Sequence, residues 1–144
     1  MKQNDSVYLL KECDAGAKMA IASFDEVLDK VQDPTMKEIL SNSRSEHVKI
    51  RDEVEMLLAD YNTNEKEPNP IAKGMSWLKT NAMMMMDESD ATVADLMIDG
   101  CNMGVKSLHK YINQYPAANS NCKDLCDQLV SIEDALCKDL RKYL

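Results

Sequence analysis

Four residues with reactive side chains fall on the predicted inner faces of helices in this sequence: His47, Cys101, Glu133 and Asp14. An imidazole, a thiolate and a carboxylate together suit a single zinc or iron ion, with water as a fourth ligand. The same groups, once buried, otherwise need hydrogen-bond partners inside the protein. The sequence therefore leaves two alternatives: a zinc or iron site, or a buried hydrogen bond between His47 and Glu133 that fixes how the helices align. We favour the hydrogen bond, and we predict no cofactor and no catalytic residue.

The heights of these residues in a helical bundle follow from counting turns away from each connection. The count places His47, Cys101 and Glu133 at about the same level, near the middle of the bundle. Asp14 falls lower, near the level of His109. These two residues form a further and less favoured alternative, an acid and a base for proton-transfer catalysis.

The clearest helix that positions these residues is predicted over 89–115. Ser89 is suited to cap its start and Pro116 to stop it. Hydrophobic residues between them recur at alternating spacings of three and four, the pattern of a helix packed lengthwise in a bundle. Gly100 and Gly104 lie four apart beside that seam, which predicts that another helix or a ligand comes unusually close there. We favour close helix packing.

Further helices are predicted over residues 5–31, 34–61, 71–86 and 121–143. The short Asp33-Pro34 connection forces the first two into an antiparallel hairpin. The first helix has two alternative seams: one is hydrophobic except for Asp14, and the other runs through Cys13 and leaves Asp14 at its edge. The fold class is therefore all-α, with residues 1–144 as a single domain.

Composition and charge exclude several classes of function. The net charge of -8 leaves no basic surface for nucleic acid or for an anionic membrane. No stretch is apolar enough to span a bilayer and the first residues are too polar for a signal peptide, so we expect a cytoplasmic protein. The five cysteines lack the spacing of a disulfide framework. Cys122 and Cys126 share one helix face but supply only half of a zinc site, so we interpret the thiols as core residues.

The helix order resembles that of the ferritin-like superfamily: two long antiparallel helices, a shorter helix over 71–86 as a crossover, then two more long antiparallel helices. The stretches SEHVKIRDEVEMLL and DLMIDGCNMGVKSLHKYINQY are also similar to those of bacterial members of that superfamily with no assigned activity. The resemblance implies a ferritin-like four-helix bundle with a helical crossover. In the di-iron members of the superfamily, two carboxylates and two Glu-x-x-His motifs hold the iron.

This sequence departs from that ligand pattern. Arg44 stands three residues before His47, where the motif requires glutamate. Lys106 stands in the same place before His109, and Glu133 has no histidine three residues later. We therefore expect a non-catalytic structural or interaction protein, with binding of a single zinc or iron ion as the alternative and an oxidoreductase as the least favoured reading. We also expect a homo-oligomer, because bundles commonly form dimers and the crossover is rich in methionine.

Overall fold

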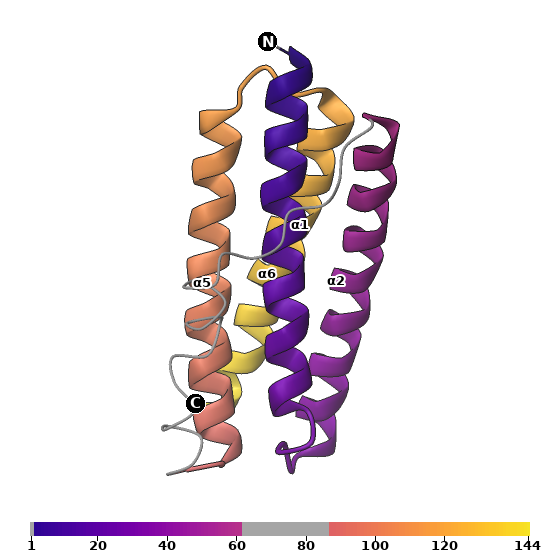
Figure 1. Cartoon of the computed structure of the whole chain (residues 1–144). Helices are drawn as coiled ribbons and strands as arrows, with labels where there is room; N and C mark the ends of the chain where they lie inside the picture. The colour runs from indigo at the N-terminus through magenta and orange to yellow at the C-terminus, as the bar shows by residue number, and fades with distance from the viewer. Residues whose placement is uncertain (1, 62–86) are drawn as a thin grey trace.

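The computed structural model describes the backbone of residues 2–61 and 87–144 and the side chains of residues 5–61 and 87–144. Within these residues the chain forms four α-helices, labelled in Figure 1, a short 3₁₀ helix and no strand. The helices are α1 (Lys2–Val27), α2 (Pro34–Asp60), α5 (Asp90–Gln114), α6 (Ser120–Leu140) and the 3₁₀ helix η1 (Arg141–Tyr143).

The all-α fold class is confirmed for the described part of the chain. The helix expected over 71–86 lies outside it. None of the helices in residues 2–61 and 87–144 is long and apolar enough to cross a membrane.

The α-helices lie lengthwise as two antiparallel hairpins, α1 with α2 and α5 with α6 (Figure 1). The bundle closes because α2 packs against α6, and α1 packs against both α5 and α6. At one end, the carboxylate of Asp90 accepts hydrogen bonds from the backbone amides of Gln32 and Asp33, at 2.8 and 2.9 Å. At the other end, Asp5 accepts one from the amide of Ala117 at 2.9 Å. Helices α2 and α5 therefore run in the same direction.

Two helices begin at the capping residues expected from the sequence. The side chain of Asp33 accepts a hydrogen bond from the amide of Met36 at 2.9 Å, and Pro34 occupies the first turn of α2. Ser89 likewise accepts one from the amide of Thr92 at 3.2 Å. Each cap satisfies a backbone donor that the first turn of a helix leaves without an intrahelical partner.

Two helix ends differ from the predicted ranges of 5–31 and 121–143. Helix α1 ends at Val27, because the chain turns over the next residues while Val31 still packs into the core at 4% exposure. Helix α6 ends at Leu140, and η1 forms the last predicted turn. Hydrophobic spacing does not separate an α-helix from a buried turn that follows it, because both direct apolar side chains inward.

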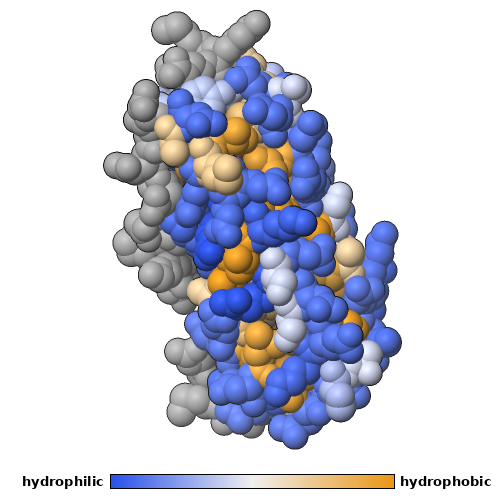
Figure 2. All heavy atoms as spheres, turned by 90° about the vertical axis from the view of Figure 1, so that its right-hand side faces the viewer, coloured by the Kyte–Doolittle hydropathy of each residue, from blue (hydrophilic) through white to orange (hydrophobic). Residues whose placement is uncertain are grey.

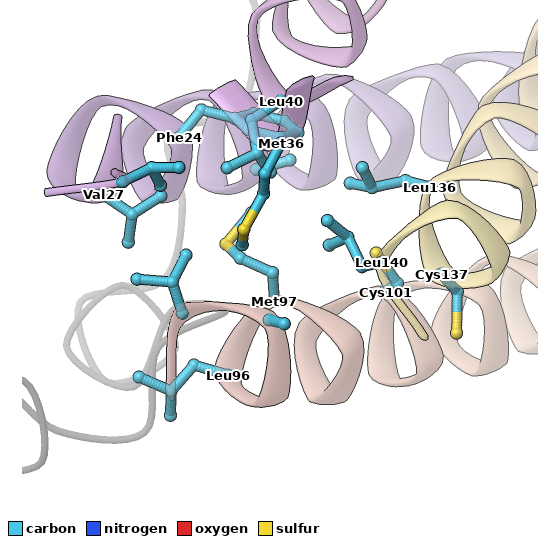
Figure 3. Packing of buried hydrophobic residues seen from close by; sticks show 14 residues of the cluster. Phe24, Val27, Met36, Leu40, Leu96, Met97, Cys101, Leu136, Cys137 and Leu140 are labelled. Carbon is cyan, nitrogen blue, oxygen red and sulfur yellow. The ribbon is translucent and has the colours of Figure 1, made fainter. Parts of the chain in front are cut away.

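The core consists of two hydrophobic clusters, one toward each end of the bundle. The cluster nearer Asp90, drawn in Figure 3, includes Phe24, Met36, Leu40, Met97, Leu136 and Leu140. The other cluster includes Leu10, Cys13, Val54, Leu108, Cys126 and Leu129. Two buried polar residues, His47 on α2 and Glu133 on α6, lie between the clusters along their helices.

Candidate functional site

The candidate site is built around a contact between His47 and Glu133, as the sequence predicted. The imidazole Nε2 of His47 lies 3.2 Å from Oε2 of Glu133. His47 is fully buried and Glu133 is 1% exposed. A polar pair at this depth loses its hydration, so each group depends on the other for hydrogen bonding. The contact joins α2 to α6, which belong to different hairpins.

The second ring nitrogen of His47 determines where the protons lie. Nδ1 is 2.7 Å from the backbone carbonyl oxygen of Ser43, one turn earlier on α2. A carbonyl oxygen can only accept, so Nδ1 carries a proton and donates it. Nε2 and Oε2 then need one further proton between them to form a hydrogen bond. Burial raises the pKa of Glu133, and the contact with His47 offsets this only in part. One proton between Nε2 and Oε2 completes the hydrogen bond, whichever of the two groups carries it.

Three neighbouring features shape this pair. The ring of Phe24 meets the imidazole edge-on, with ring centroids 5.2 Å apart. Gly104 on α5 leaves the space into which Oε1 of Glu133 points, because a Cβ at that position would collide with this oxygen. Oε1 is buried and has no hydrogen-bond partner among the described residues. The bond to His47 thus holds one oxygen of the carboxyl group, and the missing side chain at Gly104 leaves room for the other.

Cys101 lies near this pair but does not complete a set of ligands around it. Its side chain is fully buried on α5. Burial, and secondarily the charge of Glu133, raises the pKa of the Cys101 thiol well above its usual range. Among the residues that the structure describes, no three histidine, cysteine or acidic side chains are grouped closely enough to hold a metal ion. The structure brings together His47 and Glu133, and the wider metal site stays a prediction.

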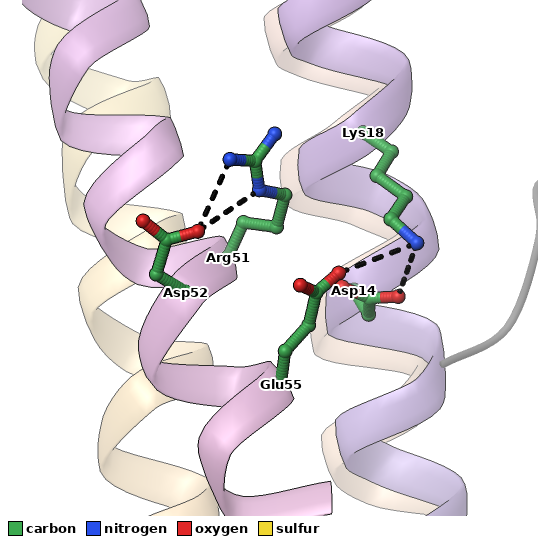
Figure 4. A network of polar contacts seen from close by, with 5 residues as sticks. All are labelled: Asp14, Lys18, Arg51, Asp52 and Glu55. Atoms are coloured by element: carbon green, nitrogen blue, oxygen red, sulfur yellow. Dashed lines mark hydrogen bonds and ion pairs between the residues drawn. The ribbon is translucent and has the colours of Figure 1, made fainter. Parts of the chain in front are cut away.

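Asp14 belongs to a separate cluster at the seam between α1 and α2 (Figure 4). Its carboxylate lies 3.0 Å from Nζ of Lys18, and the same ammonium lies 3.3 Å from Glu55 on α2. Neither oxygen of Asp14 has a well-aligned hydrogen bond among the described residues, so the Lys18 contact is an ion pair. Burial raises the pKa of Asp14 to about 7; Lys18 lowers it and Glu55 raises it further. His109, its predicted catalytic partner, is exposed on α5.

Sequence reasoning did not find every residue that shapes these sites. Ser43 and Phe24 resemble ordinary seam residues, and only the one-turn spacing between Ser43 and His47 hinted at a bond to the backbone. The thiol pair of Cys13 and Cys126 was also missed, because they come from opposite ends of the chain. The neighbouring thiol of Cys126, together with burial, raises the pKa of Cys13 well above its usual value.

Comparisons with known proteins show the fold. No family model and no curated protein matches this chain. Among solved structures, the chain is similar to the crystal structure of a DUF305 fragment from Deinococcus radiodurans, with a TM-score of 0.75. The two share 14% sequence identity, and the match covers 96% of this chain and 93% of that one. At this level of identity the likeness is one of helical fold alone.

Proposed function

We propose that this chain is a ferritin-like bundle without a complete di-iron centre, acting as a non-catalytic structural or interaction protein. The direction of the helices supports the fold assignment. Helix α2 ends the first antiparallel hairpin, α5 begins the second, and both run the same way, which is typical of a bundle with one long crossover. Arg44 and Lys106 support the absence of the di-iron centre, since they replace the glutamates of the two Glu-x-x-His motifs.

The observation that carries the proposal is that both ring nitrogens of His47 already have partners within the protein. Nδ1 donates to Ser43, and Nε2 shares a proton with Glu133. A metal ion at Nε2 would have to displace that proton and break the hydrogen bond that Oε2 makes within the described residues. The pair therefore serves to fix the alignment of α2 with α6, a use of buried polar groups known from other helical assemblies.

The test is metal content and its effect on stability. Untagged protein from cells supplied with iron, zinc and manganese should contain less than about a tenth of an equivalent of any metal, by inductively coupled plasma mass spectrometry. Its melting temperature should be the same with and without a chelator. A stoichiometric metal, lost together with several degrees of melting temperature on chelation, would overturn the proposal.

A second candidate function is binding of a single zinc or iron ion at His47 and Glu133, with Cys101 as a third ligand. Two observations favour it. A metal-binding histidine characteristically donates a hydrogen bond from its other ring N–H to a carbonyl, as the Nδ1–H of His47 does here. In addition, Oε1 of Glu133 lacks a partner among the described residues. This candidate predicts about one equivalent of metal that the His47→Ala variant loses. An oxidoreductase would in addition require iron and turnover that depends on oxygen or peroxide.

We also propose that the protein is cytoplasmic and forms a homo-oligomer through a helix face. The five cysteines support the location, because all five are free thiols, as a reducing compartment would keep them. Helical bundles commonly pair through one face, which supports the assembly. Light scattering coupled to size-exclusion chromatography should give a mass above that of the 16.2 kDa chain. A monomer at every concentration would exclude the oligomer.

A further inference from the structure

A shallow groove runs along the outer side of the seam between α2 and α6. Its volume is about 450 Å³. It lies behind the candidate site, because Glu46 precedes His47 and Ile132 precedes Glu133 in their helices. The lining side chains are Glu46, Lys49, Ile50, Glu53, Asp127, Gln128, Ser131 and Ile132. Figure 2 shows the side of the bundle that bears α2, where hydrophobic patches interrupt a hydrophilic surface.

The charged side chains of the groove are predominantly acidic and lack partners within the part of the chain that the structure describes. Glu46 and Glu53 stand on α2 and Asp127 stands on α6, against a single cation, Lys49. None of the four takes part in an ion pair or side-chain hydrogen bond with another residue of the described chain. At the seam between α2 and α1, by contrast, Arg44 of α2 pairs with Asp25 of α1 at 2.7 Å. The groove therefore keeps an excess of negative charge available to a partner.

Apolar side chains lie along the same groove. Ile50 and Ile132 line it, one from each helix. Met56 stands three residues after Glu53, one turn farther along the same wall of α2, and is 70% exposed. Leu57 beside it is only partly buried. A strip of apolar groups edged by unpaired acids is complementary to a helix with one apolar and one basic face.

We propose that this groove, between α2 and α6, docks a positively charged amphipathic helix of a partner protein. The inference rests on the proposed role as an interaction protein and names the class of partner. A volume of about 450 Å³ holds several side chains but not a whole helix, so apolar side chains of the partner would enter the groove while its basic residues contact the acidic edges. A second copy of this chain is a poor occupant, because it carries a net charge of -8.

The test measures binding of a fluorescent leucine and lysine peptide of about 18 residues, designed as an amphipathic helix. A peptide of the same composition with a scrambled order is the control for charge alone. The groove variant is Glu46→Gln with Glu53→Gln and Asp127→Asn. The matched control variant is Glu26→Gln with Glu88→Gln and Asp95→Asn, which removes the same charge from exposed acids that do not line the groove.

The groove variant should bind the amphipathic peptide about tenfold more weakly than the unaltered protein, and the control variant less than about twofold more weakly. The scrambled peptide should not distinguish the two variants. Equal weakening by both variants would mean that net charge alone attracts the peptide, and would overturn the docking site. That result leaves the proposed function standing, whereas stoichiometric metal in the content assay overturns the proposed function whatever the peptide does.

Discussion

The two buried carboxyl groups of Glu133 and Asp14 are stabilised by different contacts. Glu133 is enclosed between the two core clusters, where burial raises its pKa and the hydrogen bond to His47 offsets part of that rise. Asp14 lies at the seam of α1 and α2, where the ammonium of Lys18 can reach it from a partly exposed position. Glu55 competes for the same ammonium, so the ion pair stabilises the ionised form of Asp14 only in part.

Asp14 should therefore make the stability of the bundle depend on pH. Its pKa is raised from 3.8 to about 7 by folding, so between these values the folded chain binds a proton that the unfolded chain has released. The contribution of Asp14 to stability is present below about pH 4 and is lost as pH rises through 7. The Asp14→Asn variant should gain roughly 2 kcal/mol over the unaltered protein at about pH 8 and nothing at about pH 4, in urea unfolding at both values.

The matched control for Asp14 is Asp52→Asn. Asp52 is exposed and pairs with Arg51 at 3.1 Å on the surface of α2. Its removal should change stability by less than about 0.5 kcal/mol at every pH. If the free energy of unfolding of Asp14→Asn changed with pH in parallel with that of the unaltered protein, Asp14 would not titrate in this range in the folded state.

The sequence predicted the His47–Glu133 contact because counting turns from the connections gives the height of each residue in the bundle to within about one turn. It did not predict the Lys18 and Glu55 contacts of Asp14. Those depend on how long, flexible side chains bend at the edge of the core, which spacing along the chain does not determine.

At the scale of the element, α1 shows why the two alternative seams could not be separated. Both are buried: Cys13 and Asp14 are each fully inaccessible. Helix α1 packs against α2, α5 and α6, so it has a wider buried face than a helix with two neighbours. A periodic pattern gives the direction of the buried face, but its width depends on how many partners surround the helix.

Two of the helical glycines, Gly16 and Gly104, should respond oppositely to alanine. A Cβ on Gly104 would collide with Oε1 of Glu133, whereas a Cβ on Gly16 would meet nothing within 4 Å. Gly16→Ala should stabilise the protein by about 0.5 to 1 kcal/mol, because alanine loses less backbone entropy in a helix. Gly104→Ala should destabilise the protein by about 1 to 3 kcal/mol, because the collision outweighs the same entropic advantage of alanine. Urea unfolding of both variants measures the difference.

A double variant identifies the source of the Gly104 effect. In a Glu133→Ala background the colliding carboxyl group is absent, so Gly104→Ala should become neutral or stabilising. An unchanged loss of stability would instead locate the clash in the backbone or in another side chain. The sequence predicted a close approach at Gly104, but not that a carboxyl group from α6 makes it, because the rotamer of Glu133 is set by its bond to His47.

At the scale of the whole molecule, hydrogen bonds join the two hairpins at both ends of the bundle. In each, a carboxylate on a helix of one hairpin accepts from backbone amides in the connection of the other hairpin. Asp5 reaches the connection between α5 and α6, and Asp90 reaches the connection between α1 and α2. These bonds link residues far apart in sequence, so they align one hairpin on the other. Between the ends, the His47–Glu133 pair links α2 and α6 in the interior. The hairpins are thus aligned at three heights.

The Asp90 link should contribute measurably to the stability of the whole bundle. Asp90→Ala removes the acceptor for the amides of Gln32 and Asp33 and a favourable negative charge in the first turn of α5, so the free energy of unfolding should fall by about 2 kcal/mol. Asp95→Ala, at an exposed position on the same helix, should cost less than about 0.5 kcal/mol. Hydrogen exchange gives the local readout: the amides of Gln32 and Asp33 should exchange faster in Asp90→Ala and be unaffected in Asp95→Ala. If both variants lost the same stability and left these two amides equally protected, the carboxylate of Asp90 would not hold the hairpins together in solution, and their alignment would rest on the hydrophobic clusters and the His47–Glu133 pair.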